Sequence, residues 1–383
     1  MKVVFISTML PSGHFSQYIT SGLQKLKNVD LIIYADKNPK NLTVKGSGAI
    51  KCVFTQGPRY IIDILRELPK DKPDIIHVQQ EINMYGGPLS AVLFPFMIMA
   101  MKIMRYRVIV TLHAAVFKKQ INREFIQLFH QESPLITPTF LRLFFHYIFA
   151  GAGLFADKIM VHSNLSRKIF QEYSVAKHEI VMVRCAIPLV KPGRYRPKHY
   201  FFYFGYMVRR KGLGFALDGF QKFIQKHPNS DFKLLMAGGT IPGQEAALEE
   251  IKQQIKEYGL TTRVKILGFV EQDDLDKLYD EAYAVIIPGV VSFGSSGPLY
   301  HCNSYNKCPI TSKIGHFIED IDDKKTGILT NNDAWYKAYE WAIDHPQKIR
   351  EIEKNVAAKA ASRTPVIQAQ KYMKVYENIC SRT

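Results

Sequence analysis

Short, continuous runs of apolar residues recur along the chain and alternate with longer segments of helical periodicity. In the first half these runs lie at residues 2–8, 31–34, 74–78, 107–112, 158–162 and 180–184. In the second half they lie at residues 200–206, 232–237, 263–268, 283–288 and 309–312. Runs without polar alternation are typical of strands buried on both faces. Because helical patterns such as 15–26 and 214–226 separate them, the chain is predicted to form parallel sheets with crossover helices.

A proline-rich break divides this series into two parts of similar size. Residues 188–197 contain three prolines and a glycine, a composition typical of a linker. We therefore predict two doubly wound α/β domains, residues 1–190 and 191–365, that face a cleft. Parallel sheets of this kind bind ligands at the carboxyl ends of their strands. A last helical segment, 366–383, follows Thr364-Pro365 and is expected to pack back on the first domain.

Composition narrows the class of protein. Lys and Arg number 51 against 34 Asp and Glu, a net charge of +17. Such an excess suits nucleic acid, an anionic membrane surface or phosphorylated small molecules. No nucleic-acid-binding motif is present, so nucleic acid is not an expected partner. Five cysteines without CxxC spacing argue against a zinc site and fit a reducing compartment. Without a signal-peptide pattern or an apolar run of about 20 residues, we expect a cytoplasmic protein.

The loop after the first apolar run is a candidate site. Ser12, Gly13 and His14 lie where a strand leads into a helix, and the free amides of a helix start attract anions. The alternative is an ordinary strand–helix turn. His113 follows the run 107–112, where a site residue would project, although a single histidine is more often structural.

Two further loops also lie between a predicted strand and a predicted helix. Arg209, Arg210 and Lys211 are consecutive cations that would neutralise a diphosphate, or else form a solvated basic loop. The second loop offers serine hydroxyls and free amides that suit phosphate, or else is a glycine-rich turn. Its candidate residues are Ser295, Ser296, Gly297, Pro298 and Leu299.

In order along nearly the whole chain, these features resemble glycosyltransferase family 4. The matching segments are PDIIHV at 73–78, TLH at 111–113, ADKIMVHS at 156–163, LMAGG at 235–239, RVKILGFV at 263–270 and KCPITS at 307–312. The resemblance implies the GT-B fold and transfer of a sugar from a nucleotide-sugar donor, a UDP- or GDP-sugar, with retention of anomeric configuration and no metal. The first domain would serve the acceptor and the second the donor.

The resemblance also implies roles for particular residues. Lys211 falls on the diphosphate-binding lysine and His113 on the histidine that contacts the donor sugar, and both are expected to be catalytic. Gly13 falls on the loop that faces the donor, with Ser12 and His14 on the acceptor side. The remaining donor-binding residues implied are Arg209, Arg210, Ser295, Ser296, Gly297, Pro298 and Leu299.

Three positions depart from the family pattern. Tyr206 stands where the family has arginine, and Ser12 where it often has a first glycine. A pair of glutamates is also missing, since Gly294 and Cys302 occupy the positions counted back from Pro309. These losses motivate an alternative function, that of a degenerate GT-B protein acting as a non-catalytic partner or scaffold.

Apolar segments in the first half bear on the acceptor. Residues 88–104 are apolar but interrupted by Pro95 and Lys102, and burial under the sheet is the favoured interpretation. Residues 117–147 mix cations with bulky apolar groups, which suits a membrane interface or acceptor contact. The expected acceptor is a glycan or lipid-linked molecule in cell-surface polysaccharide or glycoconjugate synthesis, at the inner membrane face.

Overall fold

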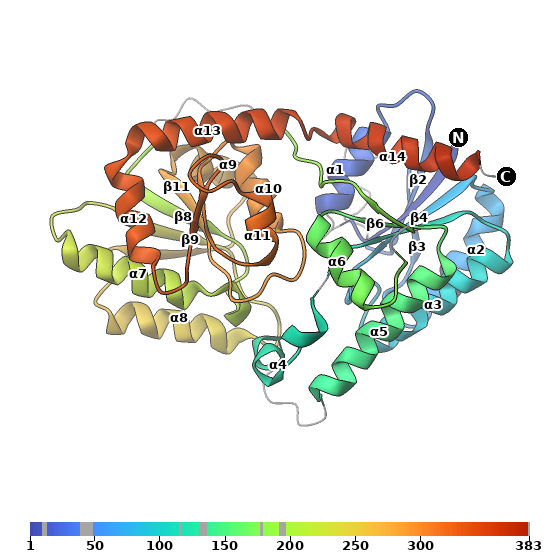
Figure 1. Cartoon of the computed structure of the whole chain (residues 1–383), viewed down its shortest axis with the longest axis horizontal. Coiled ribbons are helices and arrows are strands. Elements are labelled where there is room, and N and C mark those ends of the chain that lie inside the picture. Colours follow the sequence, from blue (N-terminus) through green and yellow to red (C-terminus); the bar gives the residue numbers. More distant parts are fainter. Residues whose placement is uncertain are drawn as a thin grey trace.

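The structure, a computed structural model, consists of two α/β domains side by side (Figure 1). It describes residues 1–9, 14–38, 49–114, 116–129, 136–176, 179–190 and 197–381. Ser12 and Gly13 lie outside the described residues, and so does most of the predicted linker, 191–196.

The first domain is built on a seven-stranded sheet in the order β3-β2-β1-β4-β5-β6-β7. All neighbouring strands run parallel. The strands are β1 (Lys2–Ile6), β2 (Asp30–Asp36), β3 (Ala49–Phe54), β4 (Ile75–Gln80), β5 (Val108–Leu112), β6 (Lys158–Val161) and β7 (Ile180–Met182). Strand β5 is buried throughout, as expected from its nearly continuous apolar run. Strand β4 is also buried throughout, although it contains the polar residues His77, Gln79 and Gln80.

The second domain has a six-stranded parallel sheet in the order β10-β9-β8-β11-β12-β13. Its strands are β8 (Tyr200–Phe204), β9 (Lys233–Ala237), β10 (Val264–Gly268), β11 (Ala284–Ile287), β12 (Pro309–Ser312) and β13 (Ile328–Thr330). The predicted fold class, two doubly wound parallel-sheet domains, is confirmed.

Helices cover both faces of each sheet (Figure 1). The first domain contains α1 (His14–Leu23), α2 (Tyr60–Asp71), α3 (Pro88–Ile103), α4 (Arg123–Phe129), α5 (Pro138–Phe155) and α6 (Asn164–Glu172). The second contains α7 (Leu213–Lys226), α8 (Glu245–Glu257), α9 (Gln272–Glu281), α10 (Gly297–Ser304), α11 (Gly315–Asp320), α12 (Trp335–Asp344) and α13 (Pro346–Ala361). Two 3-10 turns matter for the site, η2 (Lys118–Gln120) and η4 (Arg209–Lys211).

The last helix, α14 (Pro365–Cys380), returns from the second domain to pack against α1 of the first (Figure 1). The Thr364 hydroxyl caps its start by accepting a hydrogen bond from Ile367 N. Tyr372 and Tyr376 are buried in the same core cluster as β1 and β2. The Tyr376 hydroxyl lies 2.7 Å from Nδ1 of His77, so the end of the chain completes the core of the first domain.

The sequence pattern was wrong at two edge strands. It gave no strand at β3, which is only partly buried, because the run lacks the continuous apolar character of an inner strand. It also gave none at β13, which has three residues and is too short to show a period.

Candidate functional site

The carboxyl ends of the two sheets face each other across the molecule, and the polar loops gather there. In the first domain, His113 follows β5, Gln79 and Gln80 end β4, and His162 follows β6. In the second, η4 follows β8, and the loop 288–296 connects β11 to α10. This is the place where parallel sheets bind ligands.

The loop before α10 is attached to the first domain at Gly294. Gly294 forms a single antiparallel bridge with Ala114, next to His113. Its φ is +129°, and a Cβ added there would lie 2.2 Å from the His113 carbonyl oxygen. Only glycine permits both this φ and this close approach. The position counted as a family glutamate therefore has no space for a side chain here.

A second attachment runs through His316 on α11. Its Nδ1 lies 2.7 Å from the Ser292 hydroxyl, and its Nε2 lies 2.9 Å from the hydroxyl of Ser166 in the first domain. Burial lowers the pKa of His316 to about 4, so this imidazole is neutral near pH 7. The two attachments hold the loop 288–296 in a defined position between the domains.

On the first-domain side, His113 directly follows β5. Its Nε2 is 2.7 Å from Oε1 of Gln79, an acceptor, so Nε2 carries the proton and Nδ1 presents a lone pair. Burial, followed by the neighbouring His162 and His77, holds the pKa of His113 well below its usual range. Phe15 stacks on its ring at 5.9 Å between centroids. The result is a neutral, fixed imidazole whose open nitrogen is a hydrogen-bond acceptor.

Lys211 lies on the second-domain side, at the end of η4. The following Gly212 adopts φ +64° and would place a Cβ 3.1 Å from the backbone of Gly289, so the turn packs directly on the start of the loop 288–296. Burial, followed by the Arg210 charge, lowers the pKa of Lys211 to about 7. Among the described residues no acidic side chain pairs with its ammonium group. A lysine held in this way is stabilised by an anionic ligand.

The two arginines before Lys211 differ in their surroundings. The Arg209 guanidinium donates to both carboxylate oxygens of Glu250 on α8. Arg210 lies over the Phe129 ring of the first domain at 5.6 Å, and burial lowers its pKa. Glu81 carries a nearby opposite charge, and its own pKa is raised by burial. Arg210 therefore lies close to the space between the domains, whereas the Arg209 side chain is paired with Glu250 on α8.

The residues predicted around the start of α10 contribute unequally. The Ser296 hydroxyl accepts from Leu299 N at 3.3 Å, so that amide is already used. Pro298 has no N–H, and the Leu299 side chain is buried in the core. The Ser295 side chain contacts Cys185. Gly297 has open space where a Cβ would project, so it is the residue of this group that a ligand can approach closely.

The structure therefore brings His113, Arg210, Lys211 and Gly297 to the same edge region between the sheets. His14 begins α1, and Ser12 and Gly13 lie outside the described residues. Sequence reasoning missed Gln79, Glu81 and His162. Gln79 Nε2 and His162 Nε2 are buried without a partner among the described residues. Their position at strand ends was the available signal, since Gln79 lies in β4 and His162 directly follows β6.

The part of the chain that the structure describes contains no group of three or more His, Cys, Asp or Glu side chains arranged to hold a metal ion. Its candidate ligand-binding groups are instead the cations, the neutral imidazole and the backbone near Gly297.

Comparison with known proteins places this site in a family context. Residues 198–345, which contain η4 and α10, match the family described as Glycosyl transferases group 1. Alpha-1,3/1,6-mannosyltransferase ALG2 of Dictyostelium discoideum is 30% identical over 154 residues, 37% of this chain and 36% of its own length. D-rhamnosyltransferase WbpZ of Pseudomonas aeruginosa is 28% identical over 184 residues, 44% of each protein. The chain thus spans less than half the length of the curated relatives that it matches.

Solved structures match over almost the whole chain. The Anabaena protein HepE, in complex with UDP-glucose, has a TM-score of 0.75 at 17% identity and covers 99% of this chain and 100% of its own. Sucrose-phosphate synthase from Thermosynechococcus elongatus has a TM-score of 0.75 at 14% identity and covers both chains completely. At this identity the likeness shows the fold alone, and it covers both domains.

Proposed function

We propose that this chain, which carries a glycosyl transferases group 1 domain and has the GT-B fold, transfers a hexose from a nucleotide-sugar donor to a glycan or lipid-linked acceptor. The observation that carries the proposal is Lys211. It is a partly buried cation without an acidic partner among the described residues, and it ends the turn η4 that follows β8, between the two sheets.

A donor diphosphate accounts for the unpaired charge. Lys211 and Arg210 would bind its oxygens, and Gly297 would allow a phosphate to approach the start of α10. Negative charge grows on the nucleotide diphosphate as the glycosidic bond breaks, so these cations stabilise the transition state more than the ground state. The UDP and UDP-glucose complexes of HepE support a nucleotide-sugar ligand for this fold.

His113 suits the sugar part of the donor. Its Nδ1 lone pair accepts a hydrogen bond from a hydroxyl, and burial of the ring keeps it neutral. Retention of anomeric configuration and independence from metal follow from the resemblance to family 4 and are part of the proposal. In that mechanism the leaving phosphate takes the proton of the acceptor hydroxyl, so no protein base is needed.

An exposed apolar surface on the first domain supports a lipid-linked acceptor. On α3, Leu89, Phe96 and Ile103 are exposed at intervals of seven residues and therefore share one face. On α5 the exposed side chains are Phe140, Leu143, Tyr147 and Leu154. The helices pack together, and the Tyr147 hydroxyl donates to Val92 O at 3.0 Å. The opposite face of α3 is buried. The expected burial of residues 88–104 under the sheet therefore holds for that face of the helix and not for the exposed one.

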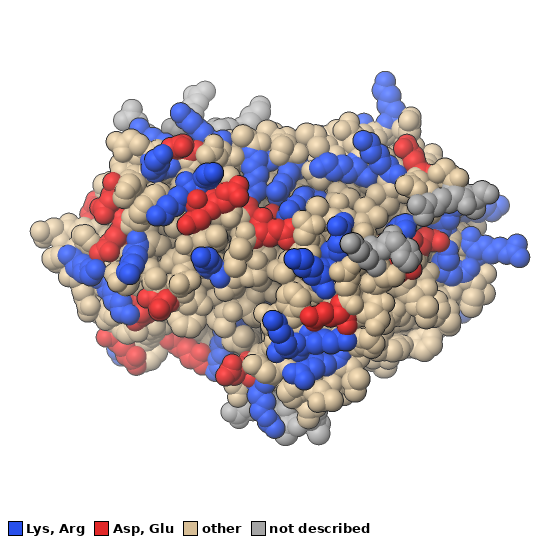
Figure 2. Space-filling view, viewed as in Figure 1, with Lys and Arg blue, Asp and Glu red and all other residues tan. Residues whose placement is uncertain are grey.

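This apolar surface, defined by the α3 and α5 side chains named above, is well suited to a membrane interface. The face seen in Figure 2 is largely uncharged over these helices, with cations at its margin. Lys119 and Arg123 are exposed nearby, and cations beside apolar groups favour anionic lipid. No described helix meets the length and hydropathy needed to cross a bilayer. We propose peripheral association with the inner membrane face, in cell-surface polysaccharide or glycoconjugate synthesis.

The experiment that tests the function is a screen of nucleotide sugars with the full-length protein. Thermal stabilisation and slow hydrolysis are measured with UDP-glucose, UDP-galactose, GDP-mannose and other hexose nucleotides. One of them is expected to stabilise the protein and to release nucleoside diphosphate. If none stabilises it and none is hydrolysed, the non-catalytic scaffold becomes the better account.

A further inference from the structure

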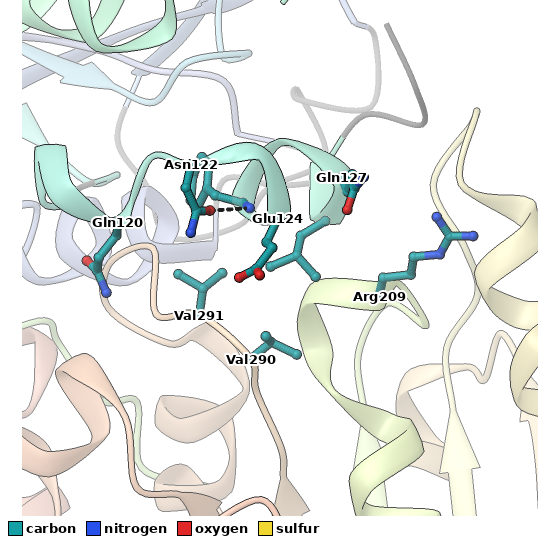
Figure 3. A pocket seen from close by; sticks show the side chains of 9 residues that line it. Gln120, Asn122, Glu124, Gln127, Arg209, Val290 and Val291 are labelled. Atoms are coloured by element: carbon teal, nitrogen blue, oxygen red, sulfur yellow. Dashed lines mark hydrogen bonds between the residues drawn. The ribbon is translucent and has the colours of Figure 1, made fainter. Parts of the chain in front are cut away.

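A cavity of about 750 Å³ lies between α4 of the first domain and the loop 288–296 of the second (Figure 3). Its volume lies within the range of small-molecule sites, about 300–1,000 Å³. Gln120, Asn122, Glu124 and Gln127 line it on one side, and Arg209, Val290 and Val291 on the other. Both domains therefore contribute to its walls.

Two of its carboxamides have a fixed orientation. Asn122 Oδ1 accepts from Phe125 N at 2.8 Å, as Figure 3 shows, and Gln120 Oε1 accepts from Phe117 N at 3.2 Å. Because each oxygen is used by the backbone, each NH₂ group remains as a donor. Glu124 and Gln127 have no partner among the described residues, so they add acceptors. The cavity thus offers donors and acceptors together, which a ligand rich in hydroxyl groups can satisfy.

The rest of the lining is apolar. Phe125, Leu128, Val290 and Val291 border the same space, and such surfaces pack against the C–H faces of a sugar ring. The walls are held in place by Phe293, whose ring lies 5.3 Å from that of Phe129 and 6.0 Å from that of Phe125. A preformed site with few placed polar groups on an apolar lining is the usual form of a small-molecule site.

The charge of the cavity separates it from the diphosphate site. Its two charged lining groups are Glu124 and Arg209, and Arg209 donates to both oxygens of Glu250. In Figure 3 the Arg209 guanidinium points away from Glu124. Glu124 is therefore the uncompensated charge, and it disfavours phosphate or carboxylate groups on a ligand.

The cavity also adjoins the turn that carries Lys211. Arg209 belongs to the same 3-10 turn, and Val290 N donates to Arg210 O at 3.0 Å. A ligand seated here would contact the loop and the turn that hold the donor. We propose that this cavity binds the body of the acceptor, an uncharged, hydroxyl-rich glycan. The inference rests on the proposed function, because it names the acceptor class for that reaction.

The test measures oligosaccharide binding to the full-length protein by calorimetry, in the presence of saturating UDP or GDP. The probes are neutral trisaccharides of glucose, mannose and galactose, and carboxylated trisaccharides of uronic acids. At least one neutral trisaccharide is expected to bind, and more tightly than any carboxylated one. Glu124→Ala with Gln127→Ala should weaken that binding about tenfold or more, since two polar contacts are lost. Glu124→Lys should shift the preference toward the carboxylated probes.

Glu377→Ala is the matched control, because Glu377 is an exposed helical carboxylate outside the cavity. It should leave trisaccharide binding unchanged, and all variants should keep the wild-type melting temperature and nucleotide-sugar affinity. The proposal is overturned if carboxylated probes bind as well as neutral ones, if no neutral probe binds at about 10 mM, or if the double variant binds like wild type. Failure of the proposed function looks different, since the wild-type protein would then not bind nucleotide sugars.

Discussion

Lys211 shows how a single residue can carry a function at a cost to the folded state. Its ordinary pKa of 10.5 falls to about 7 because burial and Arg210 disfavour the ammonium form. The folded protein therefore binds fewer protons than the unfolded chain between about pH 7 and 10.5. The free energy of unfolding therefore rises with pH through that window. Below about pH 7 the folded protein holds the charged ammonium group, and the destabilisation that this causes is complete.

Replacing Lys211 by methionine should separate stability from ligand binding. Lys211→Met keeps much of the side-chain volume and removes the partly buried charge. We expect it to raise the free energy of unfolding at pH 6 by about 1 kcal/mol or more. The gain should fade toward pH 10, where the lysine is neutral in the folded protein. Thermal unfolding at both pH values checks this, and a variant less stable than wild type at pH 6 would refute it.

Gln79 fixes the tautomer of His113, so its removal should affect the reaction more than the fold. Gln79→Leu removes the acceptor for Nε2 and lets the imidazole proton move to Nδ1. A protonated Nδ1 can no longer accept a hydrogen bond from a sugar hydroxyl. We expect kcat to fall about tenfold or more, while Gln79→Glu, which keeps an acceptor, should be less affected. Equal turnover by Gln79→Leu and wild type would contradict the assigned role.

At the scale of residues, the sequence identified positions but not partners. A strand followed by a glycine-flanked basic turn is a local pattern, and the structure has the turn η4, with Lys211, after β8. That Arg209 pairs with Glu250 could not be predicted, because the two residues are 41 positions apart and meet only through the packing of α8. The same holds for Gly294, whose constraint is the His113 carbonyl oxygen of the other domain.

At the scale of elements, two of the three glycines in the loop 288–296 and at the start of α10 have opposite surroundings. Gly294 is closely packed at φ +129°, whereas a Cβ at Gly297 would meet open space. Substitution at the two positions therefore distinguishes packing from ligand approach within one segment.

Gly297→Val should leave the fold intact and weaken donor binding. The valine side chain would project into the space that a phosphate is proposed to use, so we expect at least about tenfold lower nucleotide-sugar affinity with a melting temperature within about 2 °C of wild type. Calorimetry and thermal unfolding measure the two quantities. If affinity is unchanged, the start of α10 has only a structural role.

Gly294→Ala is the contrasting variant. The added Cβ would overlap the His113 carbonyl oxygen, and the φ is one that alanine rarely adopts. We expect a loss of about 2–4 kcal/mol in the free energy of unfolding, measured by urea denaturation. A loss below about 0.5 kcal/mol would mean that the bridge to Ala114 is not maintained in solution.

At the scale of the whole molecule, the alternation of strands and helices was sufficient to predict two doubly wound domains. Inner strands such as β5 and β11 are buried on both faces, and this leaves a nearly continuous apolar run in the sequence. Edge strands β3 and β13 leave no such run. The surface shared by α3 and α5 was also beyond prediction in detail, since which face of each helix stays exposed depends on their mutual packing.

Membrane binding should depend on both the apolar surface and its flanking cations. Arg142 lies in the cation-containing segment 117–147, but its guanidinium donates to Lys118 O and Ile121 O and holds the chain in place. We therefore expect Lys119→Glu with Arg123→Glu to weaken co-sedimentation with anionic vesicles, at about 1 kcal/mol per lost cation. Phe140→Ser with Leu143→Ser should weaken it further.

The control for this experiment changes charge elsewhere. Lys371 and Lys374 are exposed on α14, away from α3 and α5, and their replacement by glutamate should have little effect. Binding to anionic vesicles that equals binding to neutral ones, or that resists high salt, would count against an electrostatic contribution.

The most direct test of the central claim is calorimetric titration of the best nucleotide sugar into wild type and Lys211→Met at pH 6 and pH 8.5, in buffers of different ionisation enthalpy. A diphosphate bound by Lys211 should raise the pKa of its ammonium group, so wild type should take up a proton on binding at pH 8.5 and bind less tightly there than at pH 6. Lys211→Met should bind about 30-fold less tightly at pH 6 and lose this proton uptake. Nucleotide-sugar binding that is equally tight in Lys211→Met, with the same proton uptake, would contradict the account.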